Sequence, residues 1–80
     1  MTRLIFEHVG DVNFKYPYLC VYLDRLGDPF MEISVTDEQE IQFVLYPGSE
    51  LIPLTKEDFQ LILKTGESFL PEAIKIYESE

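Results

Sequence analysis

The sequence has little of the chemistry on which most small enzymes and metal proteins depend. It contains one cysteine, Cys20, and one histidine, His8. A single cysteine excludes an intramolecular disulfide, whereas small secreted domains usually carry several. No serine or cysteine stands at a recognisable catalytic spacing from His8, and one histidine with one cysteine cannot close a zinc site without several carboxylates. We therefore expect no enzymatic activity, no metal site and no bound cofactor.

Glycine-rich and calcium-binding loops are also missing. The four glycines stand far apart in the chain and form no loop that could cradle a phosphate. The acidic run at residues 37–40 lacks the twelve-residue pattern with a central glycine that calcium-binding loops have. We interpret this run as a solvated turn.

Basic residues are scarce. The chain has fifteen acidic and six basic residues, which gives a net charge of −9. Such a chain repels phosphate backbones and anionic membranes, so we expect no direct nucleic-acid binding. The acids are spread over both halves of the chain and therefore belong to the folded body. The charge is explained either by solubility alone or by electrostatic attraction to a basic protein partner.

Long hydrophobic runs are absent. No stretch approaches the roughly 18–20 apolar residues that span a bilayer. Near the N-terminus, Glu7 interrupts the apolar residues too early for the hydrophobic region of a signal peptide. We therefore expect a cytoplasmic protein without membrane association. Eighty residues, of which 46% are hydrophobic, predict one folded domain covering residues 1–80.

Four segments have the composition and alternation of strands, namely residues 3–9, 16–24, 30–36 and 41–46. Each ends at residue types that favour turns, and the short polar connections favour antiparallel hairpins. The simplest topology is a meander. The first strand could face either way, because both of its alternating sets mix apolar and polar residues.

The spacing changes to that of a helix after Pro53. Thr55 is a good N-cap, and Asp58 stands at the capping-box position. An apolar stripe follows at helical spacing and consists of Phe59, Ile62, Leu63, Gly66, Phe69 and Leu70. Pro71 predicts either a kink or the start of a second short helix. The fold class is therefore α+β, an antiparallel meander of about four strands with a C-terminal helix packed on one face.

The strand alternation divides the side chains between two faces. The face that the helix should cover consists of Leu19, Val21, Leu23, Met31, Ile33, Val35, Ile41, Phe43 and Leu45. The opposite face carries Tyr18, Cys20, Tyr22, Phe30, Val44 and Tyr46. Exposed aromatic residues are typical of protein interfaces, but cross-strand aromatic pairs also stabilise sheets. An interface on this face could receive a foreign partner or a second copy of the chain, so a homodimer stays open.

We predict that this uncovered face binds the partner, with Tyr18, Tyr22 and Tyr46 as anchors. The predicted acidic rim consists of Asp24, Asp28, Glu32, Asp37, Glu38 and Glu40. Tyrosine anchors act through burial of contact area, whereas rim charges mainly steer association.

The chain resembles the small acidic immunity proteins that bacteria pair with secreted toxins. The resemblance covers residues 28–70, and it rests on the segments DPFMEI at residues 28–33, IQFVLY at 41–46 and LTKEDF at 54–59. It implies an inhibitor whose acidic surface occludes the basic active site of a nuclease or similar toxin. Two alternatives remain: a phage-type inhibitor or nucleic-acid mimic, and a homodimeric housekeeping or structural protein.

Overall fold

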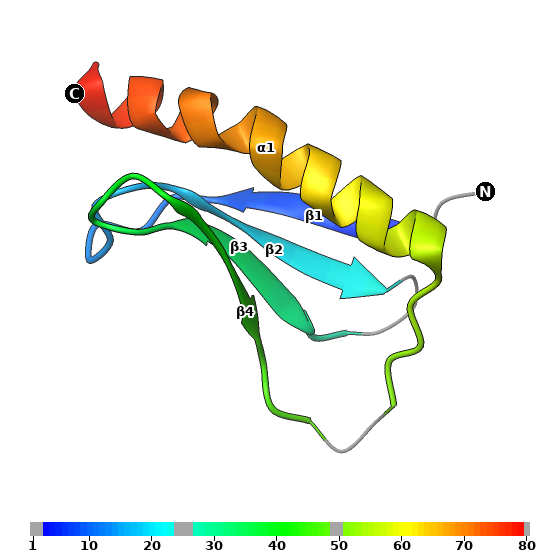
Figure 1. Ribbon diagram of the computed structural model, residues 1–80. Helices are drawn as coiled ribbons and strands as arrows, with labels where there is room; N and C mark the ends of the chain where they lie inside the picture. The colour runs from blue at the N-terminus through cyan, green and yellow to red at the C-terminus, as the bar shows by residue number, and fades with distance from the viewer. Residues whose placement is uncertain (1–2, 24–26, 49–50, 80) are drawn as a thin grey trace.

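The protein is a two-layer structure in which one long helix lies across a four-stranded sheet (Figure 1). The computed structural model describes residues 3–23, 27–48 and 51–79. Along the chain it forms β1 (Leu4–Val9), β2 (Tyr18–Leu23), β3 (Met31–Val35), β4 (Ile41–Leu45) and α1 (Lys56–Glu78). Each strand pairs antiparallel with the next, in the order β1-β2-β3-β4. The predicted α+β meander with a C-terminal helix is thus confirmed.

The hydrophobic core lies between α1 and the sheet, where the alternation places it. Leu19, Val21 and Ile33 are less than 2% exposed, and Ile62 of α1 is equally buried. Tyr22 stays only half-buried on the other side of the sheet. The predicted register of β2 and β3 is therefore confirmed, and a shift by one residue would have reversed it.

The structure decides which way β1 faces. Leu4 is buried in the core, and the ring of His8 lies 5.6 Å from that of Phe69 on α1. Ile5 is half exposed on the opposite side, where Glu7 accepts a hydrogen bond from Tyr22. The alternating residues Ile5, Glu7 and Val9 of β1 thus face away from the helix.

The start of α1 forms the predicted capping box. The Thr55 hydroxyl accepts a hydrogen bond from the Asp58 backbone N–H at 3.1 Å, and Asp58 accepts one from the Thr55 N–H at 2.8 Å. Arg3, just before β1, donates to the Asp58 carboxylate at 2.8 Å and to the Pro53 carbonyl. The Thr55 N–H, together with Arg3, lowers the pKa of Asp58 below its ordinary value. These contacts join the helix start to the N-terminal segment.

Pro71 lies inside α1, which continues as one helix to Glu78. A second helix starting at Pro71, one of the two predicted alternatives, is therefore wrong. A proline in a helix interior costs about 3 kcal/mol. Beyond it, Ala73 is fully buried, and the Tyr77 ring lies 4.9 Å from the Tyr16 ring. Packing of this last part on the rest of the protein offsets the proline penalty. In the described ranges, no helix combines the length and the apolar character needed to cross a bilayer.

The prediction that Phe30 lies on the uncovered face is wrong. Phe30 is 9% exposed and belongs to the core between sheet and helix. Its N–H donates to the Val21 carbonyl at 3.0 Å, although Val21 already has Met31 as its pairing partner. Phe30 and Met31 therefore both lie opposite Val21, and this two-to-one arrangement defines a β-bulge. The bulge interrupts the alternation, so Phe30 and Met31 both contribute to the core.

Candidate functional site

The side of the sheet that α1 does not cover, here called the open face, takes side chains from all four strands. It consists of Ile5, Glu7, Val9, Tyr18, Cys20, Tyr22, Glu32, Ser34, Gln42 and Val44, with Tyr46 directly after β4. The register sets Glu7, Cys20, Glu32 and Val44 in one row across the strands. Two carboxylates therefore flank the central Cys20.

Each of these carboxylates is joined to a tyrosine. The Tyr22 hydroxyl donates to Glu7 Oε1 at 2.8 Å, and the Tyr46 hydroxyl donates to Glu32 Oε1 at 2.7 Å. Cys20 between the two pairs is only 8% exposed. We call Tyr22–Glu7 and Tyr46–Glu32 the tyrosine–glutamate pairs. They stabilise the sheet across its strands, and they also hold two aromatic rings and two negative charges in defined positions.

The pairs shift the pKa values of their tyrosines upward. The hydrogen bond to Glu7 raises the pKa of Tyr22 to about 12. Burial first, and then the hydrogen bond to Glu32, raise the pKa of Tyr46. Both phenols therefore remain hydrogen-bond donors at neutral pH. Burial also raises the pKa of Cys20, which keeps it a thiol and not a nucleophilic thiolate.

The tyrosine–glutamate pairs have the chemistry to receive a guanidinium or ammonium group. A carboxylate that accepts one hydrogen bond from a tyrosine keeps acceptor sites on its second oxygen. A cation bound there gains a charge-assisted hydrogen bond, and a neighbouring tyrosine ring can add a cation–π contact. Because the tyrosines already hold the carboxylates in place, less side-chain entropy is lost on binding.

Tyr18, the third predicted anchor, has different surroundings. Its ring lies 5.1 Å from the ring of Phe14, which belongs to the connection between β1 and β2 and is about half exposed. Burial is the main cause that raises the pKa of Tyr18, and the nearby Asp11 adds to it. Glu7, Asp11 and Phe14 were missed by the sequence prediction. A charged residue within β1 was the available signal for Glu7.

The predicted acidic rim is divided between the two ends of the sheet. Asp28 is exposed just before β3, whereas Asp37, Glu38 and Glu40 are exposed in the turn that follows β3. The five residues of β3 separate the two groups by roughly 17 Å. Among the rim residues that the structure describes, only Glu32 lies on the open face itself, and Asp24 lies outside the described residues.

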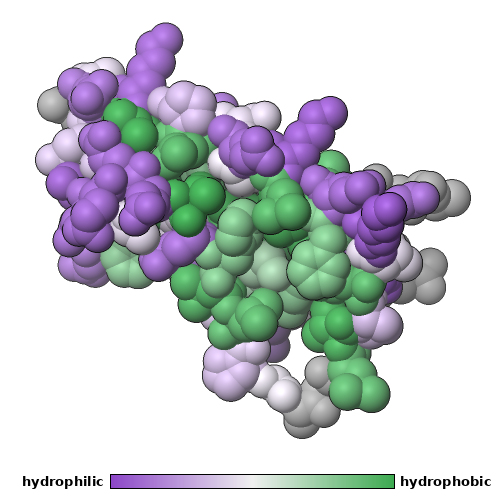
Figure 2. Space-filling view, viewed as in Figure 1, coloured by the Kyte–Doolittle hydropathy of each residue, from purple (hydrophilic) through white to green (hydrophobic). Residues whose placement is uncertain are grey.

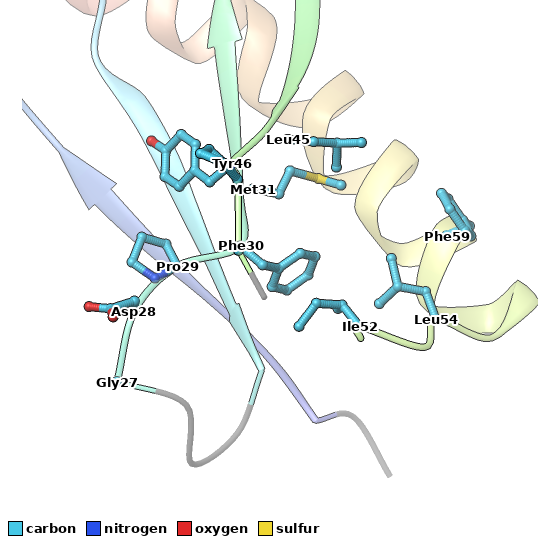
Figure 3. A pocket seen from close by; sticks show the side chains of 12 residues that line it. Gly27, Asp28, Pro29, Phe30, Met31, Leu45, Tyr46, Ile52, Leu54 and Phe59 are labelled. Carbon is cyan, nitrogen blue, oxygen red and sulfur yellow. The ribbon is translucent and has the colours of Figure 1, made fainter. Parts of the chain in front are cut away.

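An apolar groove lies on the other side of the sheet, beside β4 (Figure 3). It has a volume of about 600 Å³ and is lined chiefly by Phe30, Met31, Leu45, Ile52, Leu54 and Phe59. Leu45 is 71% exposed and Phe59 is 51% exposed. Figure 2 shows hydrophobic side chains gathered over this side of the molecule. Asp28 and Tyr46 also line the groove, so it borders the predicted site.

His8 lies away from both surfaces, on the helix side of β1. Its Nε2 atom is 3.4 Å from Glu72 Oε1 of α1. Over residues 3–23, 27–48 and 51–79, no cluster of three or more histidine, cysteine, aspartate or glutamate side chains is arranged to hold a metal ion.

Comparison of the chain with protein-family models, with curated proteins and with solved structures found no match.

Proposed function

We propose that this protein is a binding module whose open face receives arginine or lysine side chains of a basic protein partner. The single observation that carries the proposal is the presence of two tyrosine–glutamate pairs on either side of Cys20, with hydrogen bonds of 2.8 and 2.7 Å. They combine aromatic area with oriented negative charge, which are the two properties that favour a cationic partner.

The net charge of −9 supports the same partner chemistry. A strongly acidic protein attracts a basic surface over several ångströms before contact and raises the association rate, most of all at low salt. The exposed acids at the two ends of the sheet, Asp28 at one and Glu38 at the other, would contribute to this steering without being part of the central contact.

The more specific form of the proposal is an inhibitor of a basic toxin or nuclease, as the resemblance to immunity proteins implies. In that role, the glutamates occupy the positions at which the partner's basic residues otherwise hold a phosphate group. Occlusion of the site, and not chemistry performed by this chain, then stops the partner's activity. Support for this form comes from the acidity and from the resemblance.

The proposal is tested by capture from native extract at low salt, with three forms of the protein as bait. The wild type should retain a basic protein, the triple variant Tyr18→Ala/Tyr22→Ala/Tyr46→Ala should lose it, and the control Glu67→Lys, exposed on α1, should retain it. Loss of each tyrosine anchor should weaken binding by about 1–3 kcal/mol, mainly through faster dissociation. The inhibitor form further requires that the purified partner has an activity that stoichiometric wild-type protein abolishes.

Two results would contradict the proposal. One is that the captured protein is acidic or neutral. The other is that the triple variant, shown by circular dichroism to be folded, retains the partner as well as the wild type does. The first result would exclude a basic partner, and the second would place the binding surface away from the open face.

A further inference from the structure

The outer edge of β4 is unusually open for a natural sheet. In the strand order, β4 has only β3 as a neighbour among the described residues. Natural edge strands are commonly protected from pairing by charged residues, prolines or bulges. β4, with the sequence Ile-Gln-Phe-Val-Leu, contains none of these, whereas the opposite edge strand β1 contains Glu7 and His8.

The hydrogen-bond pattern shows which backbone groups of β4 point outward. At its two ends, the Thr36 N–H donates to the Glu40 carbonyl, and the Tyr46 N–H donates to the Phe30 carbonyl. Backbone groups alternate in direction along an antiparallel strand. Residues 40, 42, 44 and 46 therefore face β3, and Ile41, Phe43 and Leu45 direct their N–H and C=O groups away from the sheet.

The side chains of these three outward residues lie on the helix side, where Leu45 lines the apolar groove and Ile41 and Phe43 pack against the core. Leu45 is 71% exposed there, and across the groove Phe59 of α1 is 51% exposed. None of these residues is charged. An uncharged strip on a protein of net charge −9 is a place where two acidic molecules can approach without direct repulsion.

We propose that β4 pairs with β4 of a second copy of this chain, which forms an antiparallel dimer with a continuous eight-stranded sheet. A two-fold axis through Phe43 sets Phe43 opposite its own copy and Ile41 opposite Leu45 of the second copy. All three outward residues then meet outward residues, so each pair can exchange both of its backbone hydrogen bonds. The exposed Leu45 side chains become covered, and Phe59 lines the seam on the helix side.

The size of the strip sets the expected strength. A five-residue strand is about 17 Å long, and with the flanking groove residues the interface falls near the lower limit of about 1,000–1,200 Å² for specific association. We therefore expect a dissociation constant on the order of 10 µM. Added salt should strengthen the dimer, because it screens the repulsion between two copies of charge −9. Salt should have the opposite effect on a basic partner at the open face, so the two proposals stand or fall separately.

Sedimentation of the full chain over concentrations from a few micromolar to about a millimolar, at low and moderate salt, tests the dimer. The test variant is Leu45→Lys, and the matched control is Ile5→Lys, which changes a half-exposed aliphatic residue on the other edge strand. Each raises the net charge by one unit, so the total charge does not distinguish them. The wild type and Ile5→Lys should dimerise alike, and Leu45→Lys should weaken the dimer at least tenfold. Phe59→Lys, which changes the helix side of the same seam, should do so as well.

Three outcomes would overturn the proposal. If the wild type stays monomeric up to about a millimolar, β4 does not pair with a second copy of the chain. A dimer that Leu45→Lys and Phe59→Lys leave unchanged, or one that Ile5→Lys disrupts, places the interface elsewhere, for example on the open face.

Discussion

Gly66 lies where α1 packs directly on the sheet, and replacing it with alanine sets two effects of similar size against each other. Alanine in a helix interior is favoured over glycine by about 1 kcal/mol. A Cβ atom at Gly66, however, would lie 3.1 Å from Cε1 and Cζ of Phe43 and 3.4 Å from Cγ2 of Ile33. Contacts of 3.1 Å require the neighbouring ring to move by a few tenths of an ångström.

The position of Phe43 determines how large that second effect is. Phe43 is only partly buried and belongs to the edge strand β4, so its ring has room to shift. Overpacking a core costs about 1–3 kcal/mol, and a ring that can shift places the cost at roughly 1.5 kcal/mol. We therefore expect Gly66→Ala to destabilise the wild type slightly, by about 0.5 kcal/mol.

A double-mutant cycle isolates the contact. Phe43→Leu removes the ring atoms that Cβ would meet, so Gly66→Ala in that background should stabilise the protein by about 1 kcal/mol. The coupling between the two positions is then about 1.5 kcal/mol. Urea denaturation followed by circular dichroism measures all four proteins at about 1 µM, roughly tenfold below the dissociation constant expected for the proposed dimer, so that most chains are monomeric. If Gly66→Ala has the same effect in both backgrounds within about 0.5 kcal/mol, the packing of α1 on β4 differs from the one described.

Three further predictions concern individual side chains. The folded state raises the pKa of Tyr22 from 10.0 to about 12, so its stabilisation is complete below pH 10 and is lost as the pH rises through the folded pKa. Tyr22→Phe should therefore remove one tyrosinate absorbance step near pH 12 and reduce the alkaline loss of stability; an unchanged titration curve would argue against the bond to Glu7. The pKa of Asp58 is lowered from 3.8, so its stabilisation is present above that value and is lost as the pH falls through the folded pKa. The difference in melting temperature between wild type and Asp58→Asn should thus be largest at neutral pH and shrink in acid, and a constant difference would speak against the charged pair. Replacing His8 or Cys20 should leave partner binding intact whenever the variant folds, and loss of binding at an unchanged melting temperature would reveal a site there.

Much of the fold could be predicted because the sequence shows two clear hydrophobic periodicities, the alternation of strands and the spacing of a helix. The alternation around Leu19 and Val21 sets the buried face of the sheet, and the spacing after Thr55 predicts the helix start. Phe30 could not be placed, because a bulge leaves no mark in an alternation pattern and no glycine signals it here. The effect of Pro71 on the helix could not be predicted for a related reason. The energetic penalty of a proline in a helix is evident from the sequence, but the burial of Ala73 that offsets it depends on the tertiary structure.

The candidate site was only partly accessible from sequence. Alternation predicts that Tyr18 and Tyr22 share a face. The partners of the tyrosines depend on register, however, since Glu7 meets Tyr22 only because β1 pairs with β2 as it does. The groove depends on segments that are far apart in the chain, as Leu45 and Phe59 illustrate, and no local pattern indicates it.

The central claim, that the tyrosine–glutamate pairs receive cationic side chains, is tested most directly by an amide NMR titration with a short peptide of alternating arginine and glycine. The account predicts that shifts concentrate on the open face, around Glu7, Cys20 and Glu32, and that Glu7→Gln/Glu32→Gln weakens binding while Glu67→Gln on α1 does not. Shifts of equal size along α1, or binding that the double variant leaves unchanged, would contradict the account and reduce the acidity to a general property of the surface.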